Sequence, residues 1–405
     1  MRTFESQRVR TIVAIAVVHG LVHAFSIFLS PLNDDIRRYF LADSVSAVTA
    51  LKSTYLATYA ASNLFFGMVT NRISARKTLA VGLGVNALAI AAFALVPPTG
   101  MVWMHALWLL AAVGGGVYHP VANVLITRLY PEGKGRVLGF TGMGAAVGFA
   151  LTPLMTTGLS SVFGFDWQDV ALTFGLFGIA ASVWVYHVVR DAEAELGTLA
   201  DESEGEGRSG FGALTGIAGV LTAIILIMAT REIAMWSVLD ISDFFFVEVF
   251  GQTGQTGVYL FLLYAPGIVI QPLAGGLSDV FGRRWLTTVS FVIYGVSVGL
   301  VGVVPAGWIF LTYLGMGVGQ AASIPTIEAF VADVAGPRLR GAAYGVFFTA
   351  GIALAAAGPG GSGALIDLFG GGLDAFRLVF AVLGGFVIVA ACFIPRVIPP
   401  RDAAR

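Results

Sequence analysis

Long runs of apolar residues recur along the whole chain, and short polar segments separate them. A helix that crosses about 30 Å of hydrocarbon needs roughly 20 mostly apolar residues. Runs of that length lie at 11–32, 46–69, 78–97, 101–127, 136–161, 169–189, 213–239, 255–277, 285–304, 308–332, 341–365 and 375–395. The pattern therefore predicts an all-α polytopic membrane protein with twelve transmembrane helices.

One polar stretch is longer than the others and lies between the sixth and seventh apolar runs. It extends from Asp191 to Arg208 and is rich in acidic side chains: Glu193, Glu195, Asp201, Glu202, Glu204 and Glu206. Such a segment buries too little apolar surface to fold by itself. We therefore expect an N-terminal six-helix half at 1–190, a cytoplasmic acidic linker at 191–212 and a C-terminal six-helix half at 213–405.

The basic residues support this count and give an orientation. Cytoplasmic loops of membrane proteins carry an excess of Lys and Arg. With both termini in the cytoplasm, all but five of the 23 Lys and Arg residues fall on the inner side, the five being Arg37, Arg38, Lys52, Arg231 and Arg377. We expect a multi-pass protein of the cell membrane with both termini cytoplasmic.

Composition agrees with lipid as the surroundings and excludes several functions. Only 12% of the residues are charged and 57% are hydrophobic, whereas soluble domains carry about 25% charged residues. The net charge of −1 and the lack of a basic cluster argue against nucleic-acid binding. The single cysteine, Cys392, excludes disulfide frameworks. No Walker-type ATP motif or clustered catalytic set is present, so we expect no cofactor, no catalytic residue and no enzymatic activity. We also expect a monomer.

Several local patterns recur after about 206 residues. The segment at 67–76 aligns with that at 275–284, and the segment at 131–139 aligns with that at 337–345. Each pair falls at the same place relative to the predicted helices. Parallel repeats of this kind are a transporter architecture, in which the substrate binds near the midplane between two pseudo-symmetric bundles.

The second copy of the loop pattern resembles a family signature. It reads Gly275-Gly-Leu-Ser-Asp279-Val-Phe-Gly282-Arg283-Arg284, which is similar to the G-x-x-x-D-R-x-G-R-R loop of the major facilitator superfamily. The first copy keeps Gly67, Arg72 and Arg76 but has Asn71 in place of the acid.

The resemblance implies the major facilitator fold and a secondary active transporter that moves a small organic solute by alternating access. It also implies an inner gate in which the loop residues act together with Arg136 and Arg340. The alternative is that the arginines only fix the topology and contact anionic lipid.

The fourth apolar run points to a branch of this family. Its sequence Gly114-Gly-Gly-Val-Tyr118-His119-Pro120, with the glycine-rich fifth run that ends in Pro153, resembles the fosmidomycin-resistance-like and drug:proton antiporter branches. The arginine that many proton-coupled antiporters carry in this helix is absent from the stretch 107–113. Proton-coupled efflux therefore stays open, and a non-transporting sensor or assembly factor with the same fold is the alternative.

Ionisable residues inside membrane helices are costly and mark candidate sites. His19 and His23 are four residues apart, on one face of the first helix and near the bilayer centre. They are candidate ligands of substrate or protons, or neutral imidazoles bonded to neighbouring helices. The pair could also chelate a metal, but no further ligand is identifiable in the sequence, so no metal site is expected.

Further substrate or proton candidates lie in other helices. Tyr118 and His119 precede Pro120, which can break the helix where it lines a cavity. Arg231 and Glu232 are adjacent, so each is expected to need a partner on another helix, and Arg231 is placed near the outer surface, where it could snorkel. Glu328 is expected toward the inner end of the tenth helix, as a cap, a gate contact or a proton carrier.

Two further expectations concern loops and packing. Asp240, Asp243 and Glu248 are expected in a solvated outer loop. Glycines four residues apart are expected at tight helix crossings, at Gly135 and Gly139, at Gly144 and Gly148 and at Gly341 and Gly345.

Overall fold

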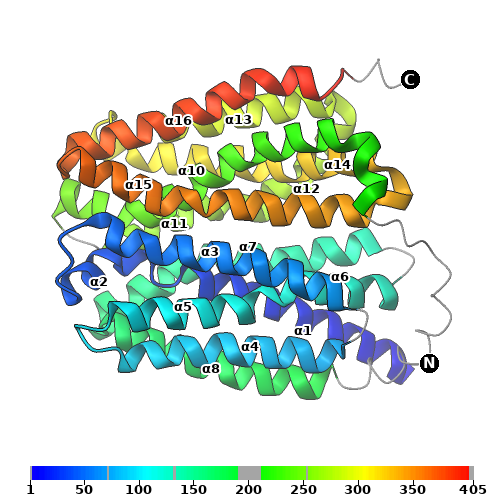
Figure 1. Ribbon diagram of the computed structural model, residues 1–405, viewed down its shortest axis with the longest axis horizontal. Helices are drawn as coiled ribbons and strands as arrows, with labels where there is room; N and C mark the ends of the chain where they lie inside the picture. The colour runs from blue at the N-terminus through cyan, green and yellow to red at the C-terminus, as the bar shows by residue number, and fades with distance from the viewer. Residues whose placement is uncertain (1, 71–72, 131–133, 190–210, 252–253, 401–405) are drawn as a thin grey trace. The chain divides into compact units, whose positions relative to one another are not determined.

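The regular elements of the chain are helices, in a computed structural model that describes residues 2–70, 73–130, 134–189, 211–251 and 254–400 (Figure 1). Most of the predicted acidic linker lies outside the described residues, as do Asn71 and Arg72. The elements before the linker are α1 (Arg2–Ile27), η1 (Ser30–Leu32), α2 (Asn33–Tyr39), α3 (Val45–Val69), α4 (Ala75–Ala92), η3 (Phe93–Leu95), α5 (Met101–Gly116), α6 (Tyr118–Leu129), α7 (Lys134–Phe163) and α8 (Trp167–Val188).

The elements after the linker are again mostly long helices joined by short turns. They are η4 (Phe211–Ile217), α10 (Ala218–Phe250), α11 (Thr256–Tyr264), α12 (Pro266–Phe281), α13 (Arg283–Leu300), η5 (Ala306–Trp308), α14 (Ile309–Ala355), α15 (Ala357–Leu368) and α16 (Gly372–Val397).

All twelve predicted spans are helical. Within the described residues, nine helical segments are both long and apolar enough to cross a membrane. The other three predicted spans, 46–69, 285–304 and 308–332, correspond to α3, α13 and the first part of α14. Large apolar side chains such as Phe65, Phe177 and Phe281 are exposed on the helix surfaces, as expected where lipid replaces water.

Prolines account for two of the helix breaks. A proline removes a hydrogen bond and clashes with the carbonyl group four residues earlier. α5 ends at Gly116, four residues before Pro120, and α14 ends at Ala355, four residues before Pro359. The break that the sequence predicts near Pro120 is thus present. α14 also contains a non-helical residue, Gly336, with φ 64°, so the tenth and eleventh spans meet there without a loop.

The chain divides into two compact units, and each is described by itself. Unit 1 contains residues 1–29, 54–152 and 158–208; unit 2 contains 30–53, 153–157 and 209–405. Unit 2 thus includes η1, α2 and the start of α3, although these precede the acidic linker in sequence.

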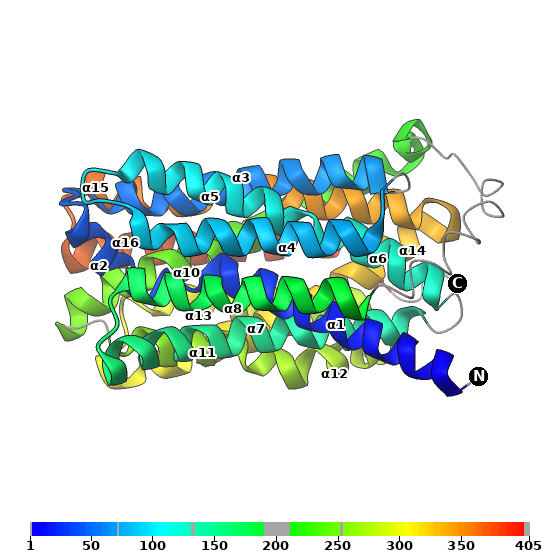
Figure 2. The ribbon, with the colours of Figure 1, turned by 90° about the horizontal axis from the view of Figure 1, so that it is seen from below.

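In unit 1, helices that are far apart in sequence pack closely. α4 lies along α8 and α5 (Figures 1 and 2). The backbone of α1 meets that of α7 at two glycines, where a Cβ on Gly144 would meet the carbonyl group of Ala16 and one on Gly148 the carbonyl group of Gly20. The tight crossing predicted at Gly144 and Gly148 is therefore present.

In unit 2, α13 packs against α14 and α16, and α10 packs against α14, α15 and α16. The other predicted glycine crossings are wrong as close backbone contacts, since a Cβ on Gly139 of α7, or on Gly341 or Gly345 of α14, would have no neighbour within 4 Å among the described residues.

α10 is longer than the sequence predicts, and this moves two acidic residues out of the expected outer loop. The helix continues past 239 to Phe250 and stops at Gly251, which has φ 71°. Asp240 and Asp243 lie inside the helix and are buried, and Glu248 is exposed but also helical. The expectation of a solvated loop was wrong for Asp240 and Asp243, because each finds polar partners in unit 2.

Candidate functional site

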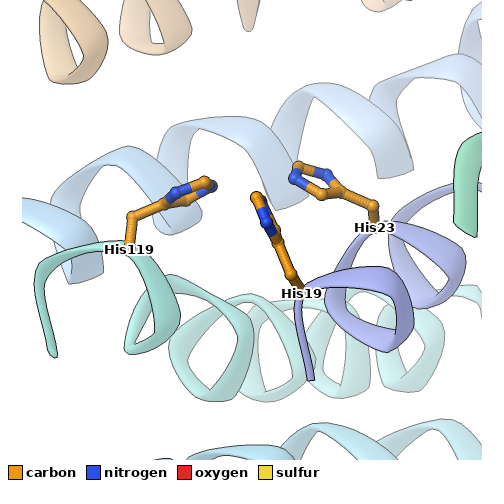
Figure 3. A group of neighbouring side chains, drawn as sticks. All are labelled: His19, His23 and His119. Atoms are coloured by element: carbon orange, nitrogen blue, oxygen red, sulfur yellow. The ribbon is translucent and has the colours of Figure 1, made fainter. Parts of the chain in front are cut away.

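Three histidines of unit 1 form a cluster, which we call the histidine cluster: His19 and His23 on α1 and His119 on α6 (Figure 3). The ring centroids lie 4.9 Å apart for His19 and His23, 5.0 Å for His19 and His119, and 5.6 Å for His23 and His119. The i, i+4 spacing places two rings on one face of α1. The helix break before Pro120 starts α6 beside these two rings, and α6 carries the third ring, His119.

Hydrogen bonding orients one ring of the cluster. His19 Nδ1 lies 2.9 Å from the backbone carbonyl oxygen of Thr141. A carbonyl can only accept, so Nδ1 carries the proton and Nε2 of neutral His19 carries the lone pair. This Nε2 atom is buried and has no hydrogen-bond partner among the described residues.

Aromatic rings surround the histidine cluster. Tyr118 stacks on His19 with centroids 4.4 Å apart, and Phe149 lies 4.3 Å from His23. Tyr59 of α3 approaches His119 edge-on at 6.4 Å. The structure therefore brings together four of the candidates singled out from the sequence: His19, His23, Tyr118 and His119.

A second polar centre lies in unit 2 around Arg231. Its side chain is 0% exposed, and it sits 13 residues into the 33-residue helix α10, near the middle. Its Nη2 group contacts the sulfur of Met228 at 3.3 Å and also Oε1 of Glu232. Its Nε and Nη1 atoms are buried without a hydrogen-bond partner among the described residues.

The expectations that Arg231 lies near the outer surface and that it does not pair directly with Glu232 were therefore wrong, whereas an acidic neighbour on another helix is present in Glu328. Arg231 does not snorkel at the outer surface, because α10 extends far enough on both sides to place it in mid-helix. It also pairs with the adjacent Glu232, because the long guanidinium side chain can fold back along the helix even though the two Cβ atoms diverge.

Glu328 and two tyrosines complete this centre. Arg231 is near enough to interact electrostatically with Glu328, Tyr264 and Tyr294. Glu328 lies in the first part of α14, and its backbone carbonyl accepts a hydrogen bond of 2.9 Å from the Tyr344 hydroxyl. The structure thus groups the candidates Arg231, Glu232 and Glu328.

A buried acidic network in unit 2 was missed at the sequence level. The Asn33 side-chain amide donates to Asp240, at 2.8 Å to its carbonyl oxygen and 3.1 Å to Oδ1. The Asp34 backbone N–H donates to Asp243 Oδ2 at 2.9 Å, and the Thr256 hydroxyl donates to Asp243 Oδ1 at 2.7 Å. The i, i+3 spacing of Asp240 and Asp243, between the apolar run that ends at 239 and the apolar residues 244–247, was the available signal.

Further charged groups join this network. Arg37 and Arg38 form ion pairs with Asp34, at 2.7 and 2.6 Å. Lys52 of α3 is 4% exposed and interacts electrostatically with Asp240. Because a charge buried in a membrane protein needs partners, these contacts hold residues 30–53 against α10.

The same segment is held to α15 by a helix cap. Asp367 accepts hydrogen bonds from the backbone N–H groups of Val45 and Ser46, at 2.8 and 2.9 Å. These donors belong to the first turn of α3, where orphan N–H groups and the helix dipole favour a carboxylate.

The loop signature lies at the end of α12 that is remote from Thr256. Gly282 has φ 88°, a conformation that favours glycine, and separates α12 from α13. Arg283 pairs with Asp333 of α14 at 2.9 Å and with Asp279 at 3.5 Å. Gly275 precedes this turn, and Arg284 lies over the Trp285 ring at 5.7 Å.

The expected partner of Asp279 was Arg340, and the structure gives a different one. Asp279 is 69% exposed and its ion pair is with Arg283, whereas Arg340 is exposed. The start of the eleventh span is set by Gly336, so Asp333 rather than Arg340 lies within reach of the loop.

Less is described of the first copy of the signature. Arg76 lies over the Tyr186 ring at 4.5 Å, and a Cβ on Gly67 would approach Pro120 at 3.8 Å. Asn71, Arg72 and the side chain of Arg136 lie outside the described residues.

Comparison with known proteins gives one family and several relatives of similar fold. The family model of the Major Facilitator Superfamily matches residues 12–265 and 241–405. An MFS-type efflux transporter, pyiT, from Pyricularia grisea is 34% identical over 110 residues, which are 26% of this chain and 18% of that protein's length.

Three solved structures match nearly the whole chain at low sequence identity. An inward-facing, unoccupied bacterial homologue of the human lysosomal transporter Spinster has a TM-score of 0.80 at 17% identity, with 96% of this chain and 97% of that chain covered. A mutant form of the nucleoside transporter NupG scores 0.74 at 13% identity, with 96% and 99% covered. A D-xylose-proton symporter scores 0.75 at 16% identity, with 96% and 98% covered. At these identities the likeness concerns the fold.

Proposed function

The chain belongs to the major facilitator superfamily of secondary transporters, and we propose that it exports a small organic solute by alternating access in exchange for protons. The proposal places it in the cell membrane as a monomer with both termini cytoplasmic. Its branch is the drug:proton antiporter or fosmidomycin-resistance-like one, on the strength of the sequence at 114–120.

The observation that carries the proposal is the histidine cluster. Three imidazoles face one another within membrane helices, and histidine is the side chain that exchanges a proton near neutral pH. His19, His23 and His119 thus offer a place where a proton and a solute compete. Tyr118 beside them offers an aromatic surface to the solute.

The Arg231 centre supports a second contact with the solute. A buried guanidinium whose Nε and Nη1 groups have no hydrogen-bond partner in the described part of the chain is suited to a carboxylate or another acceptor. We propose that Arg231, with Glu232 and Glu328, binds the polar part of the solute. The direction of transport follows the efflux transporter that matches part of the chain.

The test is transport in proteoliposomes that contain the purified protein. A panel of solutes is screened first by the shift they cause in melting temperature, and hits are then assayed for efflux and for a linked change of internal pH. In His23→Ala the solute-induced pH change is expected to vanish, because the imidazole that carries the proton is gone. His19→Ala and His119→Ala show whether the proton is shared within the cluster.

A matched control is His105→Ala. His105 lies on α5 beside Thr54, at 3.2 Å, outside the histidine cluster. Its loss should leave the pH change intact. An unchanged pH signal in all three cluster variants would refute proton coupling there. No transport of any solute in the panel would favour a non-transporting sensor or assembly factor.

We also propose that the loop signature in unit 2 latches one face of the carrier during transport. Arg283 joins α13 to Asp333 of α14, and Asp279 holds Arg283 from its other side. Asp279→Asn should lower transport about fivefold or more, the usual scale of coupling between sites, while expression and membrane insertion stay normal. Transport at the wild-type rate in Asp279→Asn would exclude the latch.

A further inference from the structure

The histidine cluster has the composition of a metal site. Its three members come from two helices, and their candidate ligand atoms all lie within 4.8 Å of one another. We propose that His19, His23 and His119 bind one divalent transition-metal ion of the zinc class. This inference goes beyond the proposed function and does not depend on it, because binding is measured without transport.

The sequence showed two of these ligands, and the fold supplies the third. An i, i+4 histidine pair on one helix can hold a metal from one side only. His119 comes from α6, 96 residues beyond His23 (119 − 23), and faces the pair (Figure 3). Three histidines with an open fourth position are a known arrangement for protein-bound zinc.

No two rings of the histidine cluster are stacked face to face. The planes of His19 and His23 differ by 43°, those of His23 and His119 by 58°, and those of His19 and His119 by 89°. By contrast, Tyr118 stacks on His19 at 23°. Imidazoles ligate through an in-plane lone pair, so rings stacked face to face could not share one metal ion, and this obstacle is absent from the three histidine pairs.

The distances require only side-chain adjustment. At about 2.0–2.1 Å per Zn–N bond, two nitrogens of a tetrahedral site lie about 3.4 Å apart. The ligand atoms are within 4.8 Å, so the closure needed is about 1.4 Å or less for each pair. Rotation about the histidine side-chain torsions covers this without movement of α1 or α6.

His19 already has the tautomer, and the hydrogen bond from its other ring nitrogen, that metal binding requires. Histidines that bind a metal commonly donate their other ring N–H to a carbonyl or a carboxylate. His19 does so, since its Nδ1–H donates to the Thr141 carbonyl oxygen at 2.9 Å. Its Nε2 atom is buried and has no hydrogen-bond partner among the described residues, so the lone pair of this atom is available to bind a metal ion.

The donor set selects the class of ion. Imidazole nitrogen suits zinc, cobalt, nickel and copper, whereas magnesium and calcium prefer oxygen donors. The side chains in ring contact with the cluster are aromatic: Tyr118, Phe149 and Tyr59. Because a divalent charge at this depth is costly, we expect hydroxide or an anionic group of a solute as the fourth ligand.

The experiment uses the full chain, purified with an affinity tag that contains no histidine and treated with a chelator. Co²⁺ and Zn²⁺ are titrated into the detergent-solubilised protein, with calorimetry for stoichiometry and affinity and the Co²⁺ visible spectrum for geometry. We expect one ion per chain and a tetrahedral cobalt spectrum. His19→Gln, His23→Gln and His119→Gln should each weaken binding about tenfold or more.

The chain supplies its own controls, since two of its five histidines lie outside the cluster. His105→Gln and His187→Gln should bind the ion like the wild type. Zn²⁺ should raise the melting temperature of the wild type and of both controls but not of the cluster variants. No binding by the wild type, or equal binding after all three cluster histidines are replaced, would overturn the proposal.

Discussion

At the scale of single residues, the chain keeps several charged side chains inside helices and gives each a partner. Arg231 and Asp243 are 0% exposed, and Lys52 is 4% exposed. The positions of Arg231 and Lys52 in apolar runs could be read from the sequence, and for Arg231 this marked a candidate, whereas Asp243 follows the run that ends at 239. Their partners could not be read, because Asp34 and Asp243 are 209 residues apart. For the same reason, nothing in the order of residues indicated that His119 would join His19 and His23.

The buried guanidinium of Arg231 leads to a prediction at this scale. Arg231→Gln leaves Glu232 and Glu328 without their cation inside a membrane protein. Loss of one partner of a buried pair costs about 3–5 kcal/mol. The variant should therefore melt several degrees lower and lose transport, and Arg231→Lys should restore part of both.

The control for Arg231 is an arginine at the surface. Arg377 is 47% exposed and pairs with Asp374, which is 93% exposed, and exposed ion pairs contribute about 1 kcal/mol or less. Arg377→Gln should melt close to the wild type in a thermal unfolding assay in detergent. If Arg231→Gln matches the wild type in both melting temperature and transport, Arg231 is only a packing residue.

At the scale of the helices, apolar run length predicted the twelve spans, but the helix ends and the helix crossings depend on local chemistry. Pro120 gave the break between α5 and α6 because proline blocks a specific carbonyl. The extension of α10 to Phe250 was missed because Asp240 and Asp243 look like loop residues until their partners are known. Glycine spacing was right at Gly148 and wrong at Gly345, since spacing alone does not show which helix face meets a neighbour.

The α1–α7 crossing gives a prediction with a close control. In Gly148→Ala the new Cβ would meet the backbone carbonyl group of Gly20, and in Gly144→Ala that of Ala16. Backbone cannot move aside as a flexible side chain can, so α1 and α7 must separate. Because overpacking costs about 1–3 kcal/mol, both variants should melt lower in detergent.

Gly142 on the same helix has open space where a Cβ would stand. Gly142→Ala should melt at or slightly above the wild-type temperature, because alanine is favoured over glycine within a helix by about 1 kcal/mol. Equal melting temperatures of Gly142→Ala and Gly148→Ala would show that the close α1–α7 crossing contributes nothing to thermal stability. The histidine cluster provides a second readout, since His19 lies beside Gly20 on the helix that would be displaced.

At the scale of the whole molecule, the apolar pattern and the loop signature were sufficient for the fold class and the family. Both are confirmed, by the helices and by the family match. The two six-helix halves stay a prediction, because the compact units include residues 30–53 in unit 2. That segment is held by hydrogen bonds to α10 and α15, contacts that a sequence read helix by helix does not contain.

This arrangement bears on alternating access. Within unit 2, Thr256 and Asp279 lie at opposite ends of the 26-residue stretch formed by α11 and α12. The Asp367 cap and the acidic network bind residues 30–53 at the Thr256 end, and the Arg283 ion pairs lie at the Asp279 end. If the carrier opens its two ends in turn, we expect the first set of contacts to break when that end opens.

Substitution of Asp367 tests whether the contact between residues 30–53 and α15 opens. Asp367→Asn weakens the acceptor for the first turn of α3, a cap and dipole effect of about 1–2 kcal/mol. That energy changes a population about 5- to 30-fold, so residues 30–53 should separate from α15 more often. Thr49 reports the event, because it is 0% exposed and packs against Gly363 of α15.

The measurement is the rate of thiol labelling of Thr49→Cys after the exposed native cysteine is removed by Cys392→Ser. Asp367→Asn should speed labelling about 5- to 30-fold. Asp279→Asn lies at the other end of α11 and α12 and should leave the labelling rate unchanged or lower it. The reason is that release of the Arg283 ion pairs favours the state in which residues 30–53 stay bound to α15. Equal acceleration by both variants would mean general loosening of unit 2 and would exclude the Asp367 cap as a contact that opens in alternation with the Arg283 pairs.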